Sequence, residues 1–168
     1  MAWVCSVCGE KHEEQLRDVR MGLPEPVFQL AEAERGERAE VEDDWCRFLD
    51  RSGETRYFVR GLVHVPVRGE ADDFRFGIWV EVTSVDFERL GELWHDPDGS
   101  ETGPVFGALA NELAPYVDTV DLPVAVQLRD VRILPAVIVL DAHHPLGADQ
   151  RAGISVPAAD RLAETALH

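Results

Sequence analysis

The chain has 168 residues, and 32 Asp and Glu residues against 16 Lys and Arg residues give it a formal net charge of −16. This length suits one domain, residues 1–168, and the 45% hydrophobic fraction is too high for a disordered acidic tail. The negative charge repels nucleic-acid phosphates and anionic lipids, and no apolar run approaches the roughly 20 residues that span a bilayer. The N-terminus also lacks the pattern of a signal peptide. We therefore expect a cytoplasmic protein that binds neither nucleic acid nor membranes.

The first predicted elements are an N-terminal knuckle and a polar helix. Residues 1–12 are expected to form a compact segment packed onto the domain, because Cys5 and Cys8 are two residues apart and Gly9 permits a tight turn. Residues 28–44 are rich in Glu, Ala and Arg and favour a short, solvated helix, although Gly36 weakens it.

The strongest pattern in the chain predicts a β-hairpin. Residues 57–67 and 74–82 alternate apolar and polar side chains, and a polar turn separates the two runs. Either Thr83 or Ser84 is placed to cap a helix that carries Phe87, Leu90 and Trp94 on one side. Within the hairpin, Trp79 is expected in the core and His64 is expected to pair with a cross-strand partner.

The C-terminal half predicts further strands and a last helix. Residues 105–113 fit either a strand or a short helix, whereas 124–128 and 134–140 are typical of strands, the second one well buried. Ser155 is placed to cap a helix with an apolar stripe of Ala159, Leu162, Ala163 and Ala166. The predicted fold is α+β, with a mainly antiparallel sheet, short helices and the N-terminal zinc-knuckle-like segment.

The most specific motif predicts a zinc site. The thiolates of Cys5 and Cys8 can hold one tetrahedral ion, His12 follows closely, and Cys46 completes a Cys₃His set from a distant segment. Four protein ligands leave no open position, so the predicted zinc is structural. The alternatives are a small buried core residue at Cys46, a surface residue at His12, and a redox pair at Cys5 and Cys8.

A second cluster follows the apolar strand near residue 140. Asp141 can orient an imidazole of His143 or His144, an arrangement used in acid–base catalysis and metal binding. The simpler interpretation is a strand end followed by a turn, with His144 held by a backbone carbonyl. His144 is also a substitute for His12 as fourth zinc ligand. We assign no catalytic residue here.

Several short motifs, taken in order, resemble a bacterial family known as domain of unknown function 2199. They are Cys5-x-x-Cys8-Gly9-x-x-His12, Glu34-Arg35-x-x-Arg38, Asp44-x-Cys46, Phe58-x-Arg60-Gly61, Val65-Pro66-Val67, Phe76-Gly77-Ile78-Trp79-Val80, His144-Pro145-Leu146, Gln150 and Gly153-Ile154-Ser155. The resemblance covers nearly the whole chain and implies no activity. It implies that Cys5, Cys8, His12 and Cys46 form one functional set and draws attention to His144, Pro145 and Gln150. The chain departs from the family at Arg47-Phe48, where small apolar residues are expected.

Three functions remain open from the sequence. The leading one is a zinc-stapled module whose acidic surface binds a basic protein, as an immunity-type protein binds a basic toxin, because opposite charges speed association. Seven of the 32 acidic residues lie in residues 32–44, shortly before Cys46, which suggests a docking face there. The alternatives are a metal-dependent enzyme that uses the His143/His144 region and a thiol or zinc redox sensor.

Overall fold

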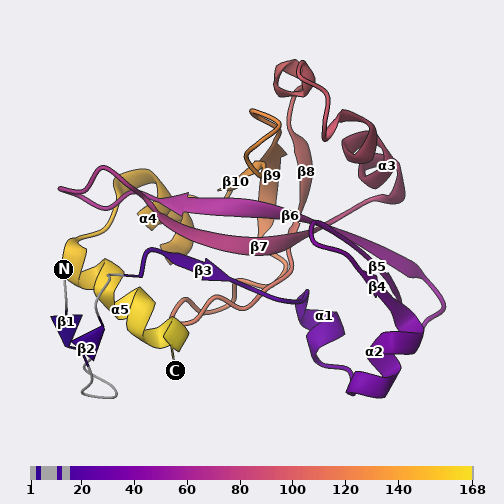
Figure 1. Cartoon of the computed structure of the whole chain (residues 1–168), viewed down its shortest axis with the longest axis horizontal. Coiled ribbons are helices and arrows are strands. Elements are labelled where there is room, and N and C mark those ends of the chain that lie inside the picture. Colours follow the sequence, from indigo (N-terminus) through magenta and orange to yellow (C-terminus); the bar gives the residue numbers. More distant parts are fainter. Residues whose placement is uncertain (1–2, 5–10, 13–15, 168) are drawn as a thin grey trace.

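The structure is a computed structural model in which residues 3–4, 11–12 and 16–167 are described (Figure 1). The α-helices of the described residues are α1 (Glu25–Phe28), α2 (Glu32–Arg38), α3 (Ser84–Leu93), α4 (Pro145–Ala152) and α5 (Val156–Leu167), with a short 3₁₀ turn, η1 (Gly99–Glu101). Their strands are β1 (Trp3–Val4), β2 (Lys11–His12), β3 (Asp18–Arg20), β4 (Ala39–Val41), β5 (Trp45–Leu49), β6 (Thr55–Val65), β7 (Phe74–Val82), β8 (Val105–Leu109), β9 (Pro123–Gln127) and β10 (Ala136–Val139).

Five of the strands close into a small barrel. β6 pairs with β7, β7 with β8, β8 with β9 and β9 with β10, and all four pairings are antiparallel. β10 returns to β6 through one parallel pair, Ala136 with Leu62, which closes the barrel. β3 lies parallel beside β7, and the antiparallel hairpin β4–β5 extends the sheet beyond β6. The α+β fold with a mainly antiparallel sheet is therefore confirmed.

The period-two alternation of the hairpin divides its side chains between two hydrophobic clusters. One set of alternate residues, including Val63 of β6 and Ile78 of β7, lies in the main core with the inward side chains of β8–β10, and α3 and α5 add apolar residues to it. The opposite face carries Phe58 and Trp79, which are fully buried in a second cluster with Val27 of α1. The predictions of an antiparallel hairpin and of a core position for Trp79 are confirmed.

Both predicted helix caps are present. The Thr83 side chain accepts a hydrogen bond from the Asp86 N–H at 3.2 Å, and the Ser155 hydroxyl accepts one from the Ala158 N–H at 3.2 Å. Phe87 and Leu90 of α3 are buried, as the apolar side of that helix predicts. None of the helices within the described ranges is long and apolar enough to cross a membrane.

Two segments differ from the sequence prediction, and a third resolves an ambiguity that the prediction left open. In residues 28–44 the helix covers only 32–38, because 39–41 pair with β5 as a strand. Residues 105–109 form a strand, which decides the ambiguity of 105–113. The prediction that 134–140 is well buried holds for only part of the run: Val137 and Val139 are buried, but Ile138 is 39% and Leu140 44% exposed. β10 is a barrel strand, so alternate side chains point away from the interior.

Candidate functional site

The four predicted zinc ligands are only partly within the described residues. Cys5 and Cys8 lie outside them, and His12 belongs to β2, which pairs with β1 through the backbone. Figure 1 draws β1 and β2 at the left end of the molecule and β5, which carries Cys46, at the right end. Over the described ranges, no group of three or more His, Cys, Asp or Glu side chains is arranged to hold a metal ion. The zinc site stays a prediction.

Cys46 lies in the second hydrophobic cluster. Its residue is 1% exposed and packs in the same cluster as Phe48, Phe58 and Trp79. Burial raises the pKa of the Cys46 thiol to about 12, because the charged thiolate loses its hydration there. In the structure Cys46 thus has the environment of a core cysteine, and β5 is not brought together with β2.

The Asp141–His144 segment has the contacts of a strand end followed by a helix cap. His144 precedes α4, where its Nδ1 accepts a hydrogen bond from the Leu146 N–H at 3.1 Å. Nδ1 therefore carries no proton, and the Nε2–H donates to the Val117 carbonyl at 2.8 Å. The Asp141 carboxylate accepts from the backbone N–H of His143, which lowers its pKa. The simpler interpretation, with His144 held by a backbone carbonyl, agrees with these contacts.

A strongly acidic hollow lies between β4–β5 and α3. It has a volume of about 430 Å³ and is lined by acidic side chains from two separate segments, namely Glu40, Glu42, Glu88 and Glu92. We call it the acidic groove. Figure 1 shows α3 lying above β4 and β5 at the right end of the molecule, which is why residues distant in sequence meet there.

The floor of the acidic groove is aromatic. The ring of Trp45 makes an edge contact with Phe87, with centroids 5.2 Å apart, and a tilted contact with Trp94 at 4.4 Å. Trp45 is half-buried, so part of its surface remains open to the groove. Aromatic faces attract guanidinium and ammonium groups, and a ring of carboxylates strengthens that attraction.

A cation of the chain itself already lies in the acidic groove. The guanidinium carbon of Arg47 is 5.0 Å from the centre of the Phe87 ring, and its Nη1 is 3.7 Å from an oxygen of Glu40. The side chains of Arg47 and Glu40 are both mostly exposed, so this ion pair contributes little to stability. The contact shows how an arginine fits against this aromatic surface.

The sequence pointed to only half of the acidic groove. The acidic stretch over 32–44 contains Glu40 and Glu42, but the contribution of α3 was missed. Its signal is the spacing of Glu88 and Glu92, four residues apart, which places both carboxylates on one face of the helix. That α3 lies against the β4–β5 hairpin depends on the tertiary fold and has no local sequence signal.

The comparisons with known proteins add a family and no activity. A family profile described as an uncharacterised protein conserved in bacteria, DUF2199, matches residues 4–154. No curated protein and no solved structure matches the chain. Since the profile spans most of the sequence, including the hairpin, the barrel and the Gln150 segment, the chain belongs to the bacterial DUF2199 family.

Proposed function

We propose that the chain is a non-catalytic protein-binding module that takes a basic segment of its partner in the acidic groove. The observation that carries this proposal is the convergence of four glutamates from β4, the following turn and α3 around the aromatic floor of Trp45 and Phe87. A lysine or arginine side chain can stack on such a floor while its charge meets the surrounding carboxylates.

The distribution of charge favours a protein segment over a metal ion as the occupant. The glutamates of the groove are too dispersed to form a metal-binding group within the described residues. A peptide can place separate cationic side chains near each pair of carboxylates. The net charge of −16 adds a long-range field that attracts a basic partner and raises its association rate.

We also propose a structural zinc ion at the N-terminal knuckle, held by Cys5, Cys8 and His12; Cys46, the fourth ligand expected from the sequence, is left out of this set because it lies in the second hydrophobic cluster. The support is the sequence spacing, which suits a tetrahedral ion. In this proposal the metal orders the N-terminal segment and takes no part in binding the partner.

The test of the binding proposal uses a synthetic peptide in which arginines alternate with leucines, and an otherwise identical peptide with glutamates. Binding is followed by the tryptophan fluorescence of the full chain. The arginine peptide should bind with an affinity that falls as salt rises, because salt screens the carboxylates of the groove. The glutamate peptide should not bind.

The matched variants separate the acidic groove from general attraction by a negative protein. Glu88→Gln/Glu92→Gln removes two groove charges, and Glu101→Gln/Glu112→Gln removes two exposed charges elsewhere. We expect the first pair to weaken binding by about tenfold and the second by less than about twofold, in line with modest energies for exposed charges. Equal losses in both pairs would show that the groove is not the binding site.

A further inference from the structure

A second hollow lies at the seam where the barrel closes. β10 meets β6 at one registered pair, supported by the Leu62 N–H donating to the Pro135 carbonyl at 2.9 Å. After this pair, the same edge of β10 makes its backbone hydrogen bonds with side chains of α4: Val137 and Val139 bond to Gln150, and Val139 also bonds to Arg151. A hollow of about 330 Å³ opens beside this seam, and its lining includes His64, Pro66, Ala136, Ile138, Gln150 and Arg151. We call it the seam hollow.

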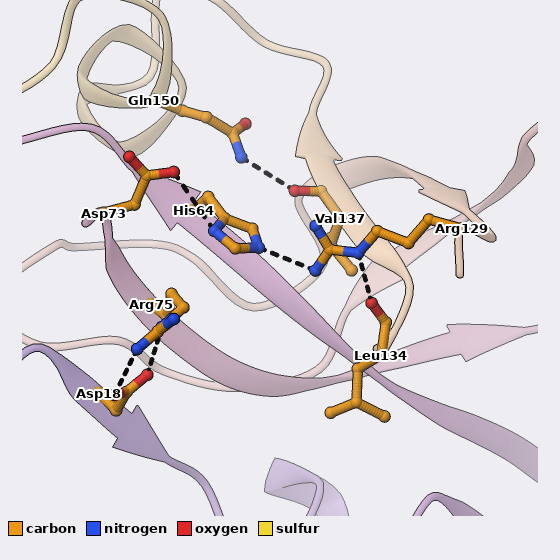
Figure 2. Close-up of polar contacts among 8 residues, drawn as sticks. All are labelled: Asp18, His64, Asp73, Arg75, Arg129, Leu134, Val137 and Gln150. Carbon is orange, nitrogen blue, oxygen red and sulfur yellow. Dashed lines mark hydrogen bonds and ion pairs between the residues drawn. The ribbon is translucent and has the colours of Figure 1, made fainter. Parts of the chain in front are cut away.

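His64 is fixed at the seam hollow from two sides, as Figure 2 shows. Its Nδ1 lies 3.4 Å from an Asp73 carboxylate oxygen, and its Nε2 lies 2.8 Å from Nη2 of Arg129. A guanidinium can only donate, so Nε2 accepts and the ring proton sits on Nδ1, facing Asp73. Burial and the charge of Arg129 lower the pKa of His64, which agrees with a neutral ring.

Arg151 lines the seam hollow and Arg129 contacts its lining residue His64, and neither arginine is neutralised by a carboxylate in the described part of the chain. Arg151 donates to the Gly147 and Val139 carbonyls, and Arg129 donates to the Leu134 carbonyl and to His64. Within the described residues, neither one forms an ion pair with Asp or Glu. By contrast, Arg75, the cross-strand neighbour of His64, is paired with Asp18 through two hydrogen bonds of 2.6 and 2.8 Å (Figure 2).

Two arginine side chains near one hollow that lack a carboxylate partner among the described residues are unusual on a protein with a net charge of −16. Asp73 is the acidic residue that faces His64, and it is bound to the imidazole rather than to either arginine. Burial lowers the pKa of Arg129, which means that its charge is partly desolvated without an ionic partner. An anion in the seam hollow would lie on the side of His64 that lines it and would attract the charge of Arg129 through the intervening ring.

We propose that the seam hollow binds a small organic carboxylate with an apolar tail. The tail lies against Pro66, Ala136 and Ile138, and the carboxylate contacts Arg151 within the field of Arg129. Arginine is suited to this role because its planar guanidinium binds carboxylates through paired hydrogen bonds. The apolar wall with a few convergent polar groups is the usual composition of a small-ligand site.

The proposal is tested with three probes that share one tail: hexanoate, hexanol and hexylammonium. Each is titrated into the full chain while NMR follows the methyl groups of Val137 and Ile138 and the ring of His64. Hexanoate should give saturable shifts with an affinity at least about tenfold higher than that of hexanol, because a charge-assisted pair is added to the same apolar contact. Hexylammonium should bind most weakly.

Two variants and a control show which part of the seam hollow binds the carboxylate and which part binds the apolar tail. Arg151→Gln should remove the preference for hexanoate over hexanol, and Ala136→Leu, which fills the hollow, should weaken both. Arg89→Gln, on the exposed side of α3, removes the same charge elsewhere and should leave all three affinities unchanged. Equal binding of hexanoate and hexanol to the unaltered chain, or no shifts at these residues, would overturn the proposal. So would an Arg151→Gln variant with a native spectrum and an unchanged preference.

Discussion

The side-chain amide of Gln150 pairs with β10 in the way a neighbouring strand would. Its Oε1 accepts from the Val139 N–H at 2.9 Å, and its Nε2 donates to the Val137 carbonyl at 2.9 Å, the bond drawn in Figure 2. The edge of β10 that faces α4 lacks further ladder bonds to β6, so this side chain satisfies backbone groups that folding takes out of water.

Removing the Gln150 amide should therefore destabilise the barrel at its seam. We expect Gln150→Ala to lower the free energy of unfolding by about 2 kcal/mol, since two backbone groups lose their partner. Gln150→Glu keeps the acceptor for Val139 but loses the donor to Val137. It should also be destabilising, because two oxygens then face each other. Urea unfolding measures both, and an unchanged midpoint for Gln150→Glu would contradict the assigned pairing.

The role of Gln150 marks the limit of what sequence patterns predict here. The hairpin of β6 and β7 was predictable, because alternation and a polar turn are local signals. The caps at Thr83 and Ser155 were predictable for the same reason. The bonds of Gln150 depend on which strand edge α4 meets, and the acidic groove depends on α3 reaching β4. Neither relationship leaves a local pattern, because each one arises from a contact between elements that are distant in the sequence.

His64 should make stability depend on pH through its contact with Arg129. Because its pKa is lowered in the folded protein, the unfolded chain binds the proton more readily. The stabilising contribution is complete above the ordinary pKa of 6.5 and is lost as pH falls from there through the folded pKa. His64→Gln keeps an acceptor for Arg129 and does not titrate. In urea unfolding, the free energy of unfolding of the unaltered chain, measured relative to that of this variant, should fall from pH 8 to pH 5. A difference between the two proteins that does not change with pH would exclude this role.

Cys46 should prove to be a core residue rather than a zinc ligand. Its burial beside Phe48 and Phe58, at the opposite end of Figure 1 from β2, leads us to expect that Cys46→Ala keeps its zinc. The free energy of unfolding of the variant should still be about 1–2 kcal/mol lower, because removing the buried sulfur leaves a small cavity. Cys8→Ala should lose the metal. Elemental analysis of both purified variants decides the matter, and loss of zinc from Cys46→Ala would restore the four-residue set.

Arg47 should compete with a basic partner for the acidic groove. It lies over Phe87 and near Glu40, the two kinds of contact that an incoming arginine would use. We expect Arg47→Ala to tighten binding of the arginine–leucine peptide by about fivefold, which corresponds to about one exposed cation–π contact and ion pair. Arg89→Ala changes the net charge equally and lies outside the groove lining, so it should have a smaller effect. If Arg47→Ala weakens binding, Arg47 is part of the recognition surface instead.

Gly91 allows stability and binding at the acidic groove to be separated. It lies within α3 and lines the groove, and a Cβ added there would meet no heavy atom within 4 Å. Gly91→Ala should therefore raise the free energy of unfolding by about 0.5–1 kcal/mol, because alanine loses less backbone entropy in a helix. Gly91→Met should also stabilise α3, but its longer side chain extends into the groove and should weaken binding of the arginine–leucine peptide. Urea unfolding and the fluorescence titration on the same two variants give both quantities. Weaker binding by a Gly91→Met protein that is more stable could not be attributed to loss of folding. A Gly91→Met protein that binds the peptide unchanged would place the partner elsewhere.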